Sequence, residues 1–310
     1  MILGLHHVTA TVADAQRDLD FCLGALGLRL VKKTVNFDNR NVYHFYYGDE
    51  RGSPGTIWTT FPYAGTGVRP GRIGEGQITV TSLSVPEGSL DYWRTRLAEQ
   101  GVAAAPGPGR FGEEVLELAD PSGLRFELVA NAGDRRSPWV APGVDPAAAV
   151  RGLHGVTLTI ATPEPTVRLM TDLLDFEVVA ETEGRVRLGA GPGLPGHTVE
   201  LVYGTGAEPA RNGLGTVHHV AMAVDSPESQ LRVREELLAR GYPVTEVLDR
   251  QYFRSIYFRE PGGVLFEVAT TSPGFTVDEP VEALGQALKL PPWEEPNRRA
   301  IEAALPAITT

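Results

Sequence analysis

The sequence predicts an α+β fold in which one unit, a strand followed by a helix and further strands, occurs four times. The first observation is a strand phrase that recurs as GLHHVTATV (4–12), QITVTSLSV (77–85), GLHGVTLTI (152–160) and TVHHVAMAV (216–224). The second is the amphipathic stretch that follows each copy. The third is a closing phrase that occurs as DPSGLRFELVA (120–130) and EPGGVLFEVAT (260–270), with a shorter echo in GHTVELVYG (196–204). Internal repetition of this kind indicates repeated structural units.

Local patterns justify the elements of each module in turn. The opening phrases alternate in hydrophobicity and end in a β-branched residue, which predicts strands. The next stretches space apolar residues three and four apart, which predicts one helix each in ADAQRDLDFCLGALGLRL, SLDYWRTRLAEQGVAA, PEPTVRLMTDLLDFEVV and SPESQLRVREELLARGYPV. The Pro-Ser-Gly and Pro-Gly-Gly pieces of the closing phrases predict turns, each leading into a strand with a Glu at the same place.

The repeat also divides the chain. The modules span, in order, residues 4–63, 77–130, 152–204 and 216–271. We expect an N-terminal domain of residues 1–134 and a C-terminal domain of residues 152–271, joined by a Pro/Gly/Ala-rich linker at 135–151. In the tail, 272–310, DEPVEALGQAL and EPNRRAIEAALPAI predict two short amphipathic helices. These helices pack either across the sheets or at a subunit interface, so a homo-oligomer is left open.

Composition restricts the function. The 310 residues carry a formal net charge of −11 without a basic run, which argues against nucleic acid or an anionic membrane as a partner. No stretch of about eighteen apolar residues predicts a membrane span. The single cysteine, Cys22, cannot form an intramolecular disulfide and is expected to be a small buried residue of a cytoplasmic protein.

These modules, with His near the start and Glu near the end, resemble the vicinal oxygen chelate superfamily of glyoxalases, bleomycin-resistance proteins and extradiol dioxygenases over about residues 4–271. Three phrases are more specific, because they resemble the ring-cleaving hydroquinone dioxygenases of that superfamily: LRLVKKTVNFDNRNVYHFYYGDERGSPGTIWTTFP, TVHHVAMAV and DRQYFRSIYFREPGGVLFEVAT. The resemblance implies that βαβββ modules pair into two cupped mixed sheets, each a pseudo-barrel, and that a cup encloses one metal pocket.

The repeat indicates which modules would hold the metal. The aligned first strands place His7, Val80, Gly155 and His219 at one position, and the aligned last strands place Glu127, Glu200 and Glu267 at another, where module one offers only Trp58 or Thr59. A pocket from modules one and four combines His7, His219 and Glu267, a set of two imidazoles and one carboxylate that leaves open positions on a ferrous ion. Modules two and three offer no imidazole at these positions and are expected to pair as a metal-free structural half.

Further candidate site residues adjoin these ligands. Strand alternation places His6 and His218 on the opposite face unless a bulge turns them, yet the resemblance implies a role near the substrate for His218 and, by the repeat, for His6. Thr9 shares a strand face with His7, so its hydroxyl is expected to point into the pocket. Arg250 and Tyr257 match residues near the substrate in the resembling enzymes, where they would stabilise or protonate a bound phenolate. We expect the remaining histidines to be structural: His44, His154 and His197.

The resemblance implies an Fe(II)-dependent extradiol-type dioxygenase that cleaves the ring of hydroquinones with O₂; Mn(II) accepts the same ligands. Its partners would be a small aromatic substrate and O₂. Two alternatives remain at this point. A glyoxalase-like lyase or isomerase would normally need a fourth protein ligand, and a metal-free binding protein would not need His7, His219 and Glu267.

Overall fold

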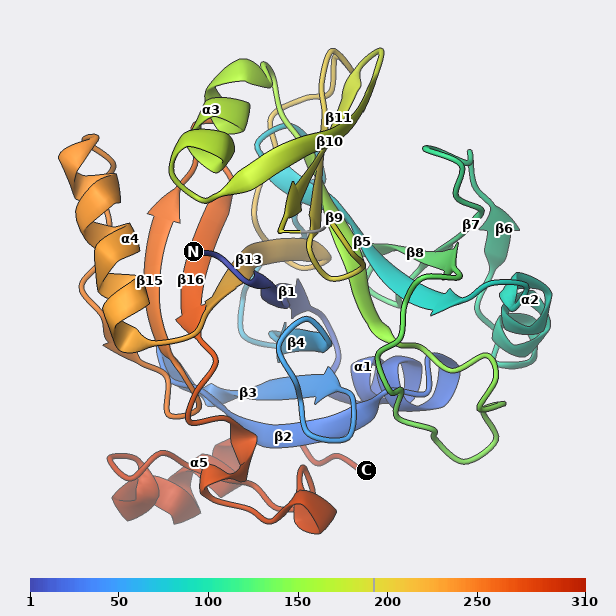
Figure 1. The fold of residues 1–310 in the computed structure, drawn as a ribbon. Coiled ribbons are helices and arrows are strands. Elements are labelled where there is room, and N and C mark those ends of the chain that lie inside the picture. The colour runs from blue at the N-terminus through green and yellow to red at the C-terminus, as the bar shows by residue number, and fades with distance from the viewer. Residues whose placement is uncertain (192) are drawn as a thin grey trace.

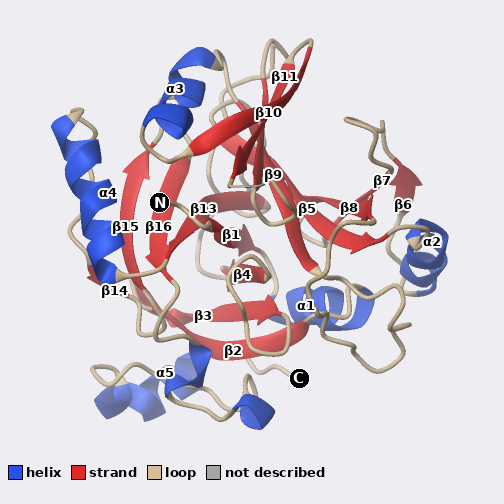
Figure 2. Ribbon diagram, viewed as in Figure 1, coloured by secondary structure: helices blue, strands red, loops and turns tan. Residues whose placement is uncertain are grey.

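The computed structural model describes residues 1–191 and 193–310, and its strands form two eight-stranded mixed sheets. Each module contributes four strands and one helix in the order βαβββ, which confirms the predicted fold class. Figure 2 shows the strands at the centre of the molecule and the helices around them.

The first sheet combines modules one and four. Its order is β14-β15-β16-β13-β1-β4-β3-β2, so that β1 and β13 pair antiparallel at the centre and each is parallel to the last strand of its own module. The bounds are β1 Gly4–Val12, β2 Arg29–Asn36, β3 Asn39–Gly48, β4 Ile57–Pro62, β13 Thr216–Val224, β14 Leu248–Asp249, β15 Arg254–Arg259 and β16 Leu265–Thr270.

The second sheet combines modules two and three with the same topology. Its order is β10-β11-β12-β9-β5-β8-β7-β6. The bounds are β5 Gln77–Pro86, β6 Ala104–Pro106, β7 Val115–Ala119, β8 Arg125–Asn131, β9 Gly152–Thr159, β10 Phe176–Thr182, β11 Arg185–Ala190 and β12 Thr198–Val202. Each sheet therefore takes one module from either side of residues 135–151, and the division of the chain into two domains at that segment stays a prediction.

One helix follows the first strand of every module. The helices are α1 Ala15–Leu19, continued by a π-helical turn at Asp20–Ala25, then α2 Leu90–Glu99, α3 Glu164–Asp172 and α4 Pro227–Ala239. The side chains of Asp14 and Ser226 accept hydrogen bonds from backbone amides in the first turns of α1 and α4, which satisfies donors that a helix start leaves open. Figure 1 shows α4 alongside β15 and β16.

The two faces of β1 have different surroundings. Val8, Ala10 and Val12 belong to a hydrophobic core that continues into both sheets. At the junction of the sheets, Trp58 of β4 lies against Phe126 of β8 with ring centroids 4.8 Å apart. His7 and Thr9 alternate with these core residues, so they lie on the other face of the strand.

The tail differs from its prediction in one helix. It contains the 3-10 turns Phe275–Val277, Val281–Ala283 and Glu295–Asn297 and the helix α5 Arg298–Ala304, so only the second predicted helix is formed. The first predicted helix, DEPVEALGQAL, begins with Asp278 and Glu279, and both bind the fully buried Lys32 of β2, Asp278 at 2.5 Å. These ion pairs fix the start of the segment against β2. Gly285 then adopts a φ of 76°, which ends any helix there. The tail lies below β2 in Figure 1.

Among the helices of the described residues, none has the length and apolar character needed to cross a membrane.

Candidate metal centre

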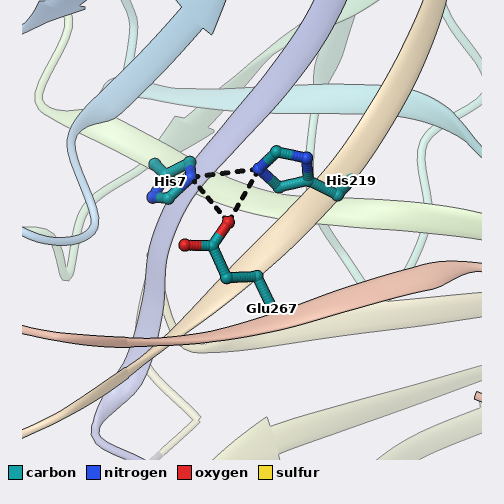
Figure 3. Close-up of side chains that lie close together, drawn as sticks. All are labelled: His7, His219 and Glu267. Atoms are coloured by element: carbon teal, nitrogen blue, oxygen red, sulfur yellow. Dashed lines mark hydrogen bonds and ion pairs between the residues drawn. The ribbon is translucent and has the colours of Figure 1, made fainter. Parts of the chain in front are cut away.

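Three side chains from neighbouring strands of the first sheet converge on one point (Figure 3). The Nε2 atoms of His7 on β1 and His219 on β13 are 3.2 Å apart, and Oε2 of Glu267 on β16 lies 3.3 Å and 2.8 Å from them. The three residues are buried, with exposed fractions of 2%, 5% and 0%. In the described part of the chain, this is the cluster whose ligand atoms could hold a metal ion.

Two β-bulges explain how adjacent histidines fit into these strands. In the pairing of β1 with β13, His6 is an extra residue between Leu5 and His7, and His218 is an extra residue opposite the step from Thr9 to Ala10. The second sheet has register shifts at the equivalent places, which leave Thr79 and His154 as the extra residues. The bulge is therefore a property of the repeat, and it removes strict alternation at the residue before each ligand.

Each candidate ligand is held by the histidine that precedes it. Nδ1 of His6 lies 2.9 Å from Nδ1 of His7, and Nδ1 of His218 lies 2.7 Å from Nδ1 of His219. An imidazole that binds a metal through Nε2 carries its proton on Nδ1, so the preceding histidine must accept that proton's hydrogen bond. Burial, together with the neighbouring imidazole, lowers the pKa of both His6 and His218 to about 3, which keeps them neutral acceptors.

Glu267 has one oxygen bound and one directed at the imidazoles. The buried hydroxyl of Ser255 donates a hydrogen bond to Oε1, whereas Oε2 has no hydrogen bond of acceptable geometry within the described residues. Burial would raise the pKa of Glu267, but His7 and His219 lower it well below its ordinary value. An ionised, buried oxygen facing two Nε2 lone pairs suits a divalent cation, so the residues present fit the metal that the fold family implies.

The cluster lines a cavity of about 420 Å³, which is within the range of small-molecule sites. Four other residues predicted from the sequence also line it: Thr9, His218, Arg250 and Tyr257. His6 does not; its ring packs against Phe253 with centroids 4.9 Å apart, so its contact with the site is through His7.

Arg250 and Tyr257 form one side of the cavity. Nε of Arg250 donates to the Tyr257 hydroxyl at 3.2 Å, and its other nitrogens contact the Asp38 carboxylate at 3.2 and 3.4 Å. Burial raises the pKa of Tyr257, and the charge of Glu267 raises it further, so the phenol stays protonated. Despite burial, the pKa of Arg250 is raised by Tyr257 and Asp38. This side of the cavity therefore offers hydrogen-bond donors to a bound oxyanion.

In the second sheet, arginines rather than imidazoles contact the glutamates. Glu127 and Glu200 occupy the repeat position of Glu267, and Arg110 binds both carboxylates. Arg187 adds a further hydrogen bond to Glu200 at 3.0 Å. Two carboxylates compensated by guanidinium groups do not need a metal ion. That this half binds no metal stays a prediction.

Sequence reasoning missed several residues of the cavity. His44, expected to be structural, lies on β3 and lines the cavity beside Tyr46 and Phe61. The aromatic phrase NVYHFYYG was the available signal, but it does not show which alternate residues face inward. Thr59 is the module-one counterpart of Glu267, because it pairs with Thr9 as Glu267 pairs with Ala221.

A family model described as the "Glyoxalase/Bleomycin resistance protein/Dioxygenase superfamily" matches residues 4–128 and 152–268. A protein of Bacillus subtilis (strain 168) named "Putative ring-cleaving dioxygenase MhqO" is 42% identical over 98% of this chain and 96% of its own. The "Chlorohydroquinone/hydroquinone 1,2-dioxygenase" of Sphingobium indicum is 36% identical over 94% of this chain and 92% of its own.

Solved structures show the same architecture. A crystal structure described as a "putative dioxygenase" from Bacillus subtilis is 42% identical and superposes with a TM-score of 0.94 over 99% of this chain and 98% of that chain. Glyoxalase I from Zea mays is 17% identical, with a TM-score of 0.66 over 87% of this chain and 92% of that chain, a likeness of fold alone.

Proposed function

The chain belongs to the glyoxalase/bleomycin resistance protein/dioxygenase superfamily, and from this premise we propose that it is an Fe(II)-dependent extradiol-type dioxygenase that opens the ring of hydroquinones with O₂. The observation that carries the proposal is the buried set of His7, His219 and Glu267 in a cavity large enough for a small aromatic ring. Ring-cleaving dioxygenase names among relatives that align over nearly the full chain support it.

In this proposal, His7, His219 and Glu267 hold the metal and leave adjacent positions open. When bound, the metal would lower the pKa of a phenol and bring it beside O₂. Mn(II) remains an alternative, since it accepts the same ligands. His6 and His218 fix the ring orientations of His7 and His219 by accepting from their Nδ1 atoms.

The remaining residues act on the substrate. Arg250 keeps its positive charge and donates to Tyr257, so the pair can stabilise negative charge on a ring oxygen. The protonated Tyr257 phenol can donate to that oxygen, and His218, with Nδ1 occupied by His219, presents Nε2 as a donor in the cavity. Thr9 contributes its hydroxyl beside the metal ligands.

Two features disfavour the glyoxalase-like lyase. The position at which a fourth ligand, a second carboxylate, would stand holds Thr59, and the Thr59 hydroxyl is already hydrogen-bonded to Thr9. A metal-free binding protein would leave a fully buried carboxylate oxygen with no hydrogen bond of acceptable geometry, which is costly. The cytoplasmic location expected from the single cysteine stays a prediction, as does a homo-oligomer.

Oxygen uptake by anaerobically Fe(II)-loaded protein, with hydroquinone, methylhydroquinone and catechol in turn, tests the proposal. We expect uptake with a hydroquinone and a matching ring-opened chromophore. His219→Ala and Glu267→Gln should lose both the bound iron and the uptake. Glu127→Gln is the matched control, because Glu127 holds the same repeat position in the second sheet and should leave both unchanged. Iron-replete protein that takes up no oxygen with any of the three compounds would refute the proposal, and full activity in either site variant would refute the ligand assignment.

A further inference from the structure

His44 holds a place in the cavity that the proposed mechanism does not use. It lies on β3, two strands from β1 and therefore about 10 Å across the sheet from the strand that carries His7. Its ring lies between those of Tyr46 and Phe61, with centroid separations of 4.0 and 4.3 Å. Contact with both rings restricts the rotation of the His44 side chain.

A chain of hydrogen bonds fixes which nitrogen of His44 carries the proton. The hydroxyl of Thr59 donates to the hydroxyl oxygen of Thr9 at 2.9 Å, which uses its single proton. Nε2 of His44 lies 2.9 Å from the same Thr59 oxygen, so Nε2 must be the donor in that contact. Nδ1 of His44 is then an unprotonated acceptor, and it has no partner within the described residues.

Thr59 occupies the position at which the other three modules carry a glutamate. Thr9 pairs with Thr59 as Ser82 pairs with Glu127, Thr157 with Glu200 and Ala221 with Glu267. Module one therefore carries, in place of a carboxylate, a hydroxyl that orients the imidazole of His44. The exchange keeps the site at three ligands and adds an acceptor to the cavity wall.

Other acceptors that line the cavity are already engaged: Oδ1 of Asn36 accepts from the Asp38 backbone amide, and the Asp38 carboxylate accepts from Arg250. Arg250 can only donate, and the Tyr257 oxygen already accepts from Arg250. Nδ1 of His218 is occupied by His219, and the Nε2 atoms of His7 and His219 face the metal position. Burial lowers the pKa of His44 well below its ordinary value, so its Nδ1 stays unprotonated at neutral pH.

We propose that Nδ1 of His44, oriented by Thr59, accepts a hydrogen bond from the hydroxyl of the substrate that lies para to the metal-bound oxygen. The proposal rests on the proposed function and deepens it, because it explains how a site built around one metal-bound oxygen selects a ring with a second, distant hydroxyl. His44 is in this role a substrate-binding residue, and Thr59 is a positioning residue that acts through it.

Anaerobic binding titrations of the Fe(II)-loaded protein test this role without turnover. Hydroquinone is compared with 4-methylphenol, which has nearly the same shape but a methyl group in place of the para hydroxyl. Hydroquinone gains a statistical factor of two, because either of its hydroxyls can bind the metal. Beyond that factor, we expect wild-type protein to prefer hydroquinone by about 2- to 12-fold, the affinity equivalent of one neutral hydrogen bond. His44→Phe, which keeps an aromatic ring between Tyr46 and Phe61, should lose the preference while its affinity for 4-methylphenol stays the same.

A conservative variant and a control complete the design. His44→Gln retains both a donor for Thr59, in Nε2, and an acceptor, in Oε1, so it should keep part of the preference that His44→Phe loses. His197→Gln is the matched control, because His197 contacts Ala190 outside the cavity, and it should behave as wild type. Iron content and thermal unfolding are measured for each protein.

The outcomes separate this inference from the proposed function. Wild-type protein that takes up oxygen with hydroquinone but binds 4-methylphenol equally well would overturn the role of His44 alone, whether or not the variants fold. A preference that survives in folded His44→Phe would overturn it as well. Wild-type protein that neither binds hydroquinone nor takes up oxygen with it would overturn the proposed function, and this inference with it.

Discussion

Replacement of Ser255 by alanine is a sharp test of how Glu267 is held in the metal centre. Ser255 lies on β15 with a fully buried side chain, and its hydroxyl donates to Oε1 of Glu267. The other oxygen, Oε2, faces His7 and His219. Ser255→Ala removes one hydroxyl without changing any of the three ligands. The Glu267 carboxylate therefore keeps its charge but loses the hydrogen bond that fixes its orientation.

The expected loss follows from the kind of hydrogen bond. A hydrogen bond to a charged group contributes about 1.5–3 kcal/mol, because its loss leaves a buried charged oxygen without a donor. If the whole loss appears in the free energy of metal binding, the dissociation constant for the metal rises by roughly 10- to 150-fold. Measured effects of residues that orient metal ligands, about 10- to 100-fold, cover nearly the same range.

Competition with a chromophoric chelator measures the dissociation constant for Fe(II) under anaerobic conditions. Ser82→Ala is the matched control, since the buried Ser82 hydroxyl donates to Glu127 at 2.7 Å in the second sheet. We expect Ser82→Ala to lower the free energy of unfolding without a change in metal affinity. A dissociation constant for folded Ser255→Ala within twofold of wild type would refute the reasoning, because Glu267 would then hold its orientation without Ser255.

Three further predictions concern other parts of the molecule. Tyr257→Phe should lower kcat with a hydroquinone by about 10²-fold, the effect of removing one donor to developing charge, with iron content unchanged; iron loss would contradict the placement of Tyr257. Arg110→Met should lower the free energy of unfolding by about 3–5 kcal/mol in denaturant titrations, because it leaves Glu127 and Glu200 short of a buried counter-charge, yet metal affinity should not change. Burial raises the pKa of Asp18 from its ordinary value of 3.8 to about 7, so the native state binds the proton more tightly than the unfolded state. The contribution of Asp18 to stability is therefore complete below pH about 4 and lost as the pH rises through about 7. In Asp18→Asn, the free energy of unfolding should depend less on pH across that interval. An unchanged slope of this free energy against pH would contradict the burial argument.

Most of the fold could be predicted from the internal repeat of the sequence. Equivalent phrases established four modules, and the distribution of His and Glu over them indicated that modules one and four would share a pocket. The structure forms its two sheets from those same pairs. The proposed ligands His7, His219 and Glu267 lie on three neighbouring strands because β1 joins β13 and β13 joins β16.

Features that depend on contacts between distant side chains could not be predicted in this way. The role of His44 depends on Thr59 and Thr9, which are on two other strands, and strand periodicity alone does not give register between strands. The first tail segment has the pattern of a helix, but its ion pairs with the buried Lys32 outweigh a weak local preference. Tertiary contacts decided the outcome in both cases.

The pairing of the outer modules around the inner ones has a consequence for synthesis on the ribosome. β1 leaves the exit tunnel early, but its antiparallel partner β13 follows much later, since His7 and His219 are 212 positions apart. The second sheet, which runs from Gln77 to Val202, can close while the nascent β1 still has an open edge. Because Glu267 belongs to β16, the proposed site cannot take up a metal until all four modules have left the ribosome. Metal capture would therefore report that all four modules have been made, and a product truncated before β16 would lack the centre however well its inner sheet had folded.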